Sequence, residues 1–331
     1  MIASLRLAAA VKERASDLGF DACGIASAGE TQHADYVHQF FQQGRHGDMA
    51  WLANRRDERL DPRTYLPGAR SIIVVATSYN VPLRHPERAE RVEGPRLPSD
   101  DQTRSLDKLG MTEGKVARYA LGIDYHDHLK NRLFTLADWL RTETPCETRV
   151  CVDTAPVLES EWAARSGIAW QGKNRLALST TLGSYLLLGE ILTTADLAGD
   201  AQATNRCGTC NACIDACPTD ALTPYQIDPR RCISTWTIEH RGDDLPGDPH
   251  GWLFGCDICQ EVCPWNRKAA PATDPLVQPR PGFESGTLDA EAVLRWTPDD
   301  FRSATRKSAM RRVKLPQLQR NARAVLSNGR A

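Results

Sequence analysis

The stretch that decides the fold of this chain reads Cys207-Gly-Thr-Cys210-Asn-Ala-Cys213-Ile-Asp-Ala-Cys217-Pro218. Its spacing, C-x2-C-x2-C-x3-C-P, is one in which three cysteines hold an iron–sulfur cluster and the fourth reaches a second cluster. A shorter run, Cys256-Asp-Ile-Cys259-Gln-Glu-Val-Cys263-Pro264, follows it, and Cys232 stands alone between the two. The pattern predicts a domain that conducts electrons.

Together the two runs and Cys232 supply the eight thiolates that two [4Fe–4S] clusters need. If the fourth cysteine of each run crosses over, the first cluster takes Cys207, Cys210, Cys213 and Cys263. The second cluster then takes Cys217, Cys232, Cys256 and Cys259. The proline after each run has no backbone N–H and ends the local helical turn, which helps to fix the direction of the crossing cysteine.

Two other interpretations of the cysteines are weaker. C-x2-C also suits a tetrahedral zinc ion, but zinc does not need a four-cysteine run that ends in Cys-Pro. A disulfide framework is disfavoured because the chain is long, its cysteine count of 11 is odd and no secretory segment precedes it. The remaining cysteines, Cys23, Cys146 and Cys151, are expected to be small buried side chains.

Composition places the chain among soluble globular proteins. Its 331 residues allow two or three domains, and 41% of them are hydrophobic and 25% charged. No apolar run approaches the ~20 residues of a membrane span, and the N-terminus shows neither a signal-peptide nor a twin-arginine pattern. We expect a cytoplasmic monomer without membrane contact, in a compartment where free thiolates are available for cluster assembly.

The order of elements predicts an α+β protein of three parts. Residues 1–198 form a mixed α/β domain, residues 199–268 form a two-cluster domain similar to bacterial ferredoxins, and residues 269–331 form a wrapping linker and a basic helical tail. In the first part we expect helices over 4–18, 125–141 and 156–165, strands over 21–25, 71–79 and 149–153, and a hairpin of 176–181 with 185–194. The segment from Pro82 to Asp107 is expected to be a surface loop.

A carboxylate stands at the end of one predicted strand, in Val150-Cys-Val-Asp153-Thr154. That edge of an α/β sheet is where ligands bind, and a carboxyl group with little water around it can act as a general acid. Aspartate is also a favoured N-cap, so Asp153 could equally cap a helix that begins at Pro156. The residues alone leave both roles open. The stretch Asp124-Tyr125-His126 is typical of a helix start.

The end of the chain is basic. After Asp300 there is no further acid, while nine cations follow: Arg302, Arg306, Lys307, Arg311, Arg312, Lys314, Arg320, Arg323 and Arg330. Such a segment is either a solvated helix or a surface for a polyanion.

Several stretches together resemble the epoxyqueuosine reductase (QueG) family, over nearly the whole chain. They are Arg59-Leu-Asp-Pro62, Leu66-Pro-Gly-Ala-Arg-Ser71, Ala117-Arg118-Tyr119, Asp124-Tyr-His126, Val152-Asp-Thr154, Gly167 to Asn174, Arg231-Cys-Ile-Ser234 and the two cysteine runs. Many ferredoxin-like domains share the cysteine runs, whereas Val-Asp-Thr combined with Gly-Lys-Asn is far more specific.

The resemblance implies an oxidoreductase that converts epoxyqueuosine to queuosine at the tRNA wobble position, in the final step of queuosine biosynthesis. It implies cobalamin beside the two [4Fe–4S] clusters, a tRNA with epoxyqueuosine in its anticodon loop and an external low-potential electron donor. It makes Asp153 the proton donor and favours Arg311, Arg312 and Lys314 as contacts to tRNA phosphates. The implied cobalamin contacts are Arg59, Ala117, Arg118, Tyr119, Tyr125, His126, Asp153, Gln171, Gly172, Lys173, Asn174, Ser234, Asp257 and Ile258.

No histidine ligand to cobalt is expected, because the D-x-H-x-x-G pattern is absent. The nearest stretch, Asp124-Tyr-His126-Asp-His-Leu129, lacks the glycine, which agrees with the base-off binding of the family. Two alternative functions fit the sequence less well. A cobalamin-dependent reductive dehalogenase is typically exported behind a twin-arginine signal, and a ferredoxin-like electron carrier leaves about two hundred N-terminal residues unexplained.

Overall fold

The computed structural model describes residues 2–83 and 112–328, which form two compact units. Unit 1 comprises Met1–Asn80, Asp124–Cys232 and Ile258–Leu276, and unit 2 comprises Val81–Ile123, Ile233–Asp257 and Val277–Ala331. The division predicted at residues 198 and 268 stays a prediction. Most of the predicted loop from Pro82 to Asp107 lies outside the described residues, as does Arg330 of the basic tail.

Unit 1 is built on a four-stranded antiparallel sheet in the order β1-β2-β7-β4. These strands are β1 (Ala22–Ser27), β2 (Ser71–Ser78), β4 (Thr148–Cys151) and β7 (Leu186–Thr193). The central strand β2 is buried along its whole length, as its continuous β-branched sequence predicts. This sheet is therefore the central sheet of unit 1.

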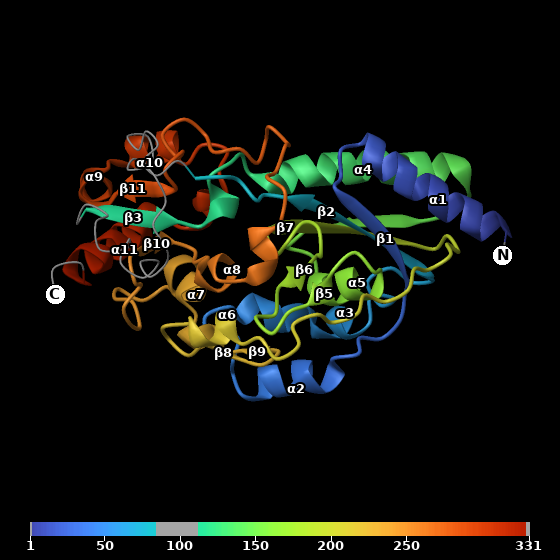
Figure 1. Cartoon of the computed structure of the whole chain (residues 1–331), viewed down its shortest axis with the longest axis horizontal. Coiled ribbons are helices and arrows are strands. Elements are labelled where there is room, and N and C mark those ends of the chain that lie inside the picture. Colours follow the sequence, from blue (N-terminus) through green and yellow to red (C-terminus); the bar gives the residue numbers. More distant parts are fainter. Residues whose placement is uncertain (1, 84–111, 329–331) are drawn as a thin grey trace, which may run out of the picture. The chain divides into compact units, whose positions relative to one another are not determined.

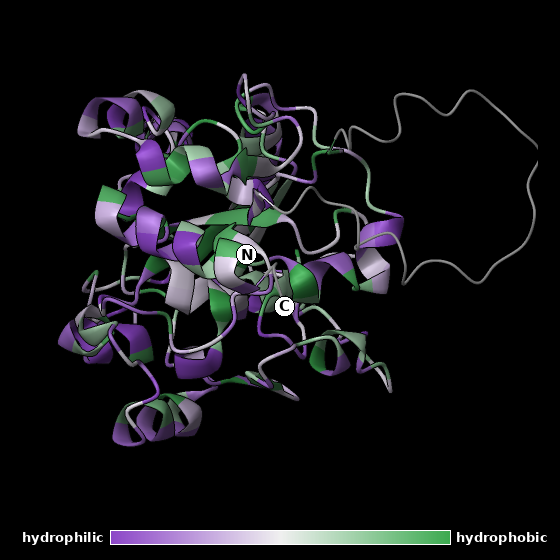
Figure 2. Ribbon diagram, turned by 90° about the vertical axis from the view of Figure 1, so that its left-hand side faces the viewer, coloured by the Kyte–Doolittle hydropathy of each residue, from purple (hydrophilic) through white to green (hydrophobic). Residues whose placement is uncertain are grey.

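Helices cover both faces of this sheet (Figure 1). One face carries α1 (Ile2–Asp17) and α4 (Tyr125–Glu143), and the other carries α5 (Glu159–Arg165). Four leucines of α4 are buried at helical spacing, Leu129, Leu133, Leu136 and Leu140. Figure 2 shows green hydrophobic residues beside purple hydrophilic ones in the helices, which is typical of helices with one buried face.

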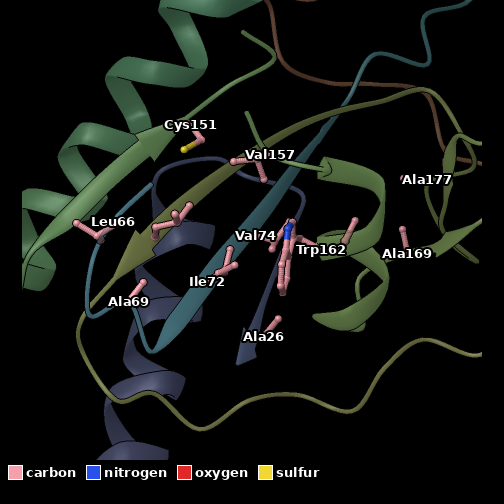
Figure 3. Close-up of a cluster of buried hydrophobic side chains, with 12 residues drawn as sticks. Ala26, Leu66, Ala69, Ile72, Val74, Cys151, Val157, Trp162, Ala169 and Ala177 are labelled. Carbon is pink, nitrogen blue, oxygen red and sulfur yellow. The ribbon is translucent and has the colours of Figure 1, made fainter. Parts of the chain in front are cut away.

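The core between α5 and the sheet is organised around one tryptophan (Figure 3). Trp162 of α5 is only 1% exposed and shares a hydrophobic cluster with Ile72 and Val74 of β2. Small side chains such as Ala26 and Ala169 belong to the same cluster and leave room for the indole. This packing fixes α5, and with it the loop that leads from β4 into the helix.

Shorter elements complete unit 1. They are α2 (Ala34–Gln42), the 3₁₀ turn η1 (Ala50–Arg55), α3 (Arg56–Leu60), β5 (Trp170–Gln171), β6 (Ala177–Leu178), α6 (Ala212–Asp215), β8 (Leu222–Thr223), β9 (Gln226–Ile227), η4 (Pro229–Arg231), α8 (Ile258–Glu261) and η5 (Pro264–Arg267). Each cysteine run has one member on a short helix, Cys213 on α6 and Cys259 on α8, and its other cysteines flank that helix. Asn266 of η5 ties them to the rest of the unit, since it accepts the Ser184 N–H at 2.7 Å and donates to the Gln260 carbonyl at 2.7 Å.

The hairpin predicted from 176–181 and 185–194 is wrong. β6 pairs with β5, whereas β7 pairs with β2 on one side and β4 on the other. A bridge between Ser179 and Gly183 closes a tight turn of its own, so β7 leaves that turn without a local partner. The apolar strand satisfies its backbone along both edges by entering the main sheet, which a two-residue partner cannot provide.

The helix predicted over 156–165 begins at Glu159, and Asp153 does not cap it. Leu158 occupies the N-cap position. Asp153 itself has a φ of 48°, and the Val157 N–H bonds the Ala155 carbonyl, so the chain turns twice before the helix starts. The capping interpretation of Asp153 is therefore wrong.

Unit 2 contains a three-stranded sheet, β10-β3-β11, beside several short helices. β3 pairs in parallel with β10 and antiparallel with β11. The elements are β3 (Glu113–Val116), η3 (Arg118–Ala120), α7 (Ile233–Ile238), β10 (Trp252–Phe254), β11 (Thr287–Asp289), α9 (Ala290–Arg295), α10 (Pro298–Ala304), η6 (Ala309–Arg312) and α11 (Leu315–Asn328). Within residues 2–83 and 112–328, the structure has no helix long and apolar enough to span a membrane.

Candidate functional site

The four predicted ligands of the first cluster line one cavity of about 340 Å³ in unit 1. These are Cys207, Cys210, Cys213 and Cys263. Burial raises the pKa of Cys213 to about 11, and negative charge on Cys263 and Cys207 adds to the effect. Burial also raises the pKa of Cys263. Thiols crowded in this way become thiolates when they bind metal ions, and the iron ions of an iron–sulfur cluster supply that positive charge.

The predicted Gly172-Lys173-Asn174 turn contributes to this same cavity. Lys173 and Asn174 line it, and the Lys173 ammonium donates to Asn211 Oδ1 at 2.8 Å. Asn174 Nδ2 is buried and has no hydrogen-bond partner among the described residues. An added Cβ on Gly172 would lie 2.4 Å from Leu178 Cδ1 and 2.7 Å from Asn174 Oδ1, so a larger residue there would displace one of these side chains. A cation and an unused amide donor beside four thiols fit an anionic cluster whose sulfur atoms accept hydrogen bonds.

The four cysteines predicted to bind the second cluster do not all belong to one unit. Cys217, Cys232 and Cys259 belong to unit 1 and Cys256 belongs to unit 2, so the ligand set of the second cluster stays a prediction. Among the three remaining thiols, Cys151 is buried as expected, whereas Cys23 and Cys146 are only partly buried.

A histidine joins two carboxylates at the start of α4. His126 Nδ1 lies 2.6 Å from Asp124 Oδ1, and Nε2 lies 3.0 Å from Asp153 Oδ2. Burial alone would lower the pKa of His126, but hydrogen bonds to both carboxylates and their charges together raise it to about 9. His126 is therefore protonated at neutral pH, and both ring nitrogens donate. The structure brings three of the sequence-predicted residues, Tyr125, His126 and Asp153, into one place, since the Tyr125 ring stacks on His126 at 4.2 Å.

Asp124 has two roles at this helix start. Its side chain accepts the His126 backbone N–H at 3.1 Å and so caps α4, which confirms the predicted helix start. The same oxygen binds the His126 ring, and this hydrogen bond lowers the pKa of Asp124. The cap therefore also orients the histidine toward Asp153.

Asp153 is held from both its backbone and its side chain. Its N–H donates to Glu159 Oε1 at 2.6 Å, while its carboxylate meets His126. The side chain remains 53% exposed and is accessible to a ligand. In parallel α/β sheets, ligands bind beyond the carboxyl ends of the strands. The four-stranded sheet of unit 1 is antiparallel, so this rule does not explain the position of Asp153. Its position follows from the turn after β4 and from the start of α4.

Sequence reasoning missed two carboxyl groups beside Asp153. Glu159 opens α5, and Glu190 lies on β7 opposite Cys151 of β4. Burial raises the pKa of Glu159 to about 8, and the charge of Asp153 adds to it. Burial also raises the pKa of Glu190 far above its usual value, with Glu159 and Asp153 contributing. The signal that could have revealed Glu190 is an acid inside the apolar run Leu186–Thr193.

Of the other sequence-predicted residues of unit 1, Arg59 lies near Glu159 of the Asp153 network, whereas Gln171 and Ile258 lie elsewhere. Arg59 of α3 donates to the Leu52 carbonyl at 3.3 Å, and burial lowers its pKa. Gln171 lines a second cavity of about 290 Å³ and accepts from Arg175 at 2.8 Å. Ile258 is the first residue of α8.

Unit 2 brings three of its predicted residues together. The Arg118 backbone N–H donates to Asp257 Oδ2 at 2.7 Å, and Asp257 is 2% exposed. An added Cβ on Gly255 would lie 2.5 Å from Ala117 Cβ, so this part of the chain requires a glycine. The other two predicted residues are Tyr119, whose ring centre lies 6.1 Å from that of Phe254, and Ser234 in α7.

The basic tail is partly neutralised within unit 2. Arg311, Arg312 and Lys314 are exposed. Arg312 nevertheless forms a two-pronged ion pair with Glu239, at 2.8 and 2.9 Å. Arg320 is 4% exposed and donates to the backbone carbonyls of Trp236 and His240, which is a structural role. The tail is therefore not a uniformly free cationic face.

Comparison with known proteins gives matches along nearly the whole chain. A family model described as "Epoxyqueuosine reductase QueG, DUF1730" matches residues 59–154, and one described as "4Fe-4S double cluster binding domain" matches residues 206–266. A curated epoxyqueuosine reductase of Synechococcus sp. (strain RCC307) is 38% identical over 322 residues, which are 95% of this chain and 92% of that protein. The second family match shows a [4Fe–4S]-binding domain and decides against zinc and disulfides.

Two solved structures are similar to this chain. A crystal structure of epoxyqueuosine reductase with an epoxyqueuosine-modified tRNA stem loop has a TM-score of 0.83 at 28% identity, covering 98% of this chain and 82% of that one. Epoxyqueuosine reductase from Bacillus subtilis, with an aspartate catalytic loop swung out of the active site, has a TM-score of 0.79 at 26% identity and the same coverage, 98% and 82%. These matches confirm the α+β fold predicted from the sequence.

Proposed function

The chain belongs to the epoxyqueuosine reductase family, and from this premise we propose that it reduces epoxyqueuosine in tRNA to queuosine. It is an oxidoreductase with a [4Fe–4S]-binding domain. The observation that carries the proposal is a 38% identical relative of that name along 95% of the chain. The match of residues 59–154 to the reductase family favours this function over the dehalogenase and electron-carrier alternatives.

The reaction removes the epoxide oxygen as water and leaves a double bond, so it consumes two electrons and two protons. We assign the electrons to the iron–sulfur domain and the first proton to Asp153, because an alkoxide is a poor leaving group unless it is protonated. His126 Nε2, 3.0 Å from Asp153 Oδ2, is placed to supply the aspartate with the proton that it passes to the substrate. The tRNA stem loop bound to a solved relative supports a tRNA substrate, and the aspartate catalytic loop of the Bacillus subtilis relative supports the role of Asp153.

We propose two [4Fe–4S] clusters and cobalamin as the cofactors. The name of the matching double-cluster family supports the count of two. When bound, cobalamin supplies the reducing centre that meets the epoxide. The contacts proposed for it are the residues that the family resemblance implies: Arg59, Ala117, Arg118, Tyr119, Tyr125, His126, Asp153, Gln171 to Asn174, Ser234, Asp257 and Ile258. Both ring nitrogens of His126 bind carboxylates, so this histidine would contact cobalamin without ligating its cobalt.

The remaining parts of the proposal follow from chemistry. An external low-potential donor is needed, because the substrate itself is reduced. Free thiolates for cluster assembly favour the cytoplasm. We also propose a monomer, with Arg311, Arg312 and Lys314 as contacts to tRNA phosphates.

The test uses the whole protein, reconstituted with iron, sulfide and cobalamin under argon. With a low-potential reductant and tRNA bearing epoxyqueuosine, digestion and mass spectrometry should show a nucleoside lighter by one oxygen atom. Protein with all three cofactors in place that leaves the nucleoside unchanged would overturn the assignment. Bound cob(II)alamin should show no nitrogen coupling from a histidine in its electron paramagnetic resonance spectrum.

A further inference from the structure

The loop that carries Asp153 passes through an uncommon backbone conformation. Asp153 has a φ of 48°, in the left-handed region, which aspartate enters more readily than most residues other than glycine. Interactions with its surroundings help to hold it there. The structure shows two interactions that do so, the hydrogen bond of its carboxylate to His126 and that of its N–H to Glu159 Oε1, at 2.6 Å.

A second carboxyl group near Glu159, that of Glu190, is buried without a hydrogen-bond partner among the described residues. Glu190 sits in the middle of β7, between Val74 of β2 and Cys151 of β4, and is 0% exposed. Neither of its oxygens has a hydrogen-bond partner among the described residues. A charge in such a place is very unfavourable, so Glu190 is a neutral acid.

The charged groups around this pair act in opposite directions. The Asp153 carboxylate disfavours a negative charge on either glutamate, whereas the cations of His126 on α4 and Arg59 on α3 favour one on Glu159. Burial and Asp153 outweigh these cations and raise the pKa of Glu159 to about 8. The positive charge of His126 already balances that of the Asp153 carboxylate, to which it is hydrogen-bonded. An ionised Glu159 would set a like charge beside the Asp153 carboxylate, whereas a neutral Glu159 still offers an oxygen to the Asp153 N–H.

We propose that Glu159, backed by Glu190, is a positioning residue that holds Asp153 through its backbone amide as a neutral carboxylic acid. The proposal rests on the proposed function only in taking Asp153 as the proton donor. The pair keeps the loop in place without repelling the group that it positions. When Glu159 ionises, above about pH 8, the repulsion loosens the loop.

Two substitutions separate this role from a general packing role. Glu159→Leu removes the acceptor, and Glu159→Gln keeps an acceptor oxygen but cannot ionise. In Glu159→Leu, amide hydrogen exchange over residues 152–158 should accelerate and kcat should fall ~10-fold or more with little change in KM, because a misplaced catalytic group slows only the chemical step. Glu159→Gln should restore most of both losses and should keep its activity to higher pH than the wild type, since its alkaline limit would then be set by His126.

The exchange measurement is made on the protein without substrate, so it stands even if the proposed reaction fails. Unchanged exchange and unchanged kcat in Glu159→Leu would overturn the proposal. If Glu159→Leu does not fold, the pH profile of Glu159→Gln decides, because an alkaline limit equal to that of the wild type contradicts a neutral Glu159. Glu190→Gln, which stays neutral, should preserve the slow exchange, and rapid exchange in this variant would count against the neutral pair.

Discussion

The cysteine cavity and the Asp153 network lie in the same unit but are built in opposite ways. Three of the four thiols of the cavity come from one short run of the sequence, on and beside α6. The network instead draws Asp153, His126, Glu159 and Glu190 from the loop after β4, α4, α5 and β7. Ligands of a compact inorganic cluster are set by local spacing, whereas a proton-handling site needs groups from elements that meet only in the folded chain.

The two regions also differ in how their charges are balanced. Each thiolate in the cavity makes its neighbours harder to ionise, so this region depends on a cofactor to offset its charge. In the network, the cation of His126 stands between two carboxylates and offsets them without any cofactor. Loss of the cofactor should therefore destabilise the arrangement of the four cysteines. The Asp153 network should keep its geometry.

The largest loss of activity is expected from removing one of the four cysteines that line the cavity. Cys263→Ser removes one ligand of the first cluster, so about half of the bound iron and essentially all reductase activity should be lost. Iron and sulfide analysis of anaerobically purified protein checks this. Cys146→Ser, which changes a thiol outside both runs, is the matched control and should keep the full iron content. Equal iron in both variants would contradict the cavity assignment.

A smaller loss of turnover, with intact cofactors, is expected from the network. Asp153→Asn keeps the size of the side chain but cannot donate the same proton, so kcat should fall ~10²-fold or more. Single-turnover assays measure this, and absorption spectra check the clusters and cobalamin. Asp127→Asn changes an exposed carboxylate on α4 and should behave as wild type. Normal turnover in Asp153→Asn would leave the aspartate as a contact without a catalytic role.

The charge balance of the network should also appear in the pH dependence of stability. The folded pKa of His126, about 9, lies above its usual value of about 6.5, so its contribution is full below pH 6.5 and lost as pH rises through 9. The free energy of unfolding should fall over this window by at most on the order of 3 kcal/mol. Urea unfolding of wild type and His126→Gln at several pH values tests this. An equally steep decline in both proteins would show that the histidine is not stabilised by its carboxylates.

The smallest effect concerns the basic tail, where ion pairing distinguishes neighbouring arginines. Arg311→Ala with Lys314→Ala should raise the KM for tRNA and flatten the plot of log Kd against log salt by about 0.7–0.9 per lost phosphate contact. Arg312→Ala should change this slope less, because Glu239 already offsets its charge. Arg6→Ala, an exposed cation of α1, serves as control. Wild-type salt dependence in the double variant would exclude the tail from the tRNA contact.

The sequence alone predicted those features of the structure that depend on interactions between residues close together in the chain. The spacing of Cys207, Cys210 and Cys213 predicted one shared site because all three lie within seven residues, on and just before α6, and they line one cavity. The β-branched run 71–78 predicted a buried central strand, and Asp124 predicted the start of α4, since capping involves only neighbouring residues. The role of Asp153 came from a family resemblance rather than from its neighbours in the sequence.

Only the tertiary structure decided what surrounds Asp153. The sequence could not show that β7 would pair with β2 and β4, and that pairing is what buries Glu190 and sets it opposite Cys151. Nor could it show that Asp153 would take a left-handed turn with its N–H on Glu159. The physical reason is that burial and like-charge crowding belong to groups far apart in the chain, and these effects exist only once the sheet and its helices have come together.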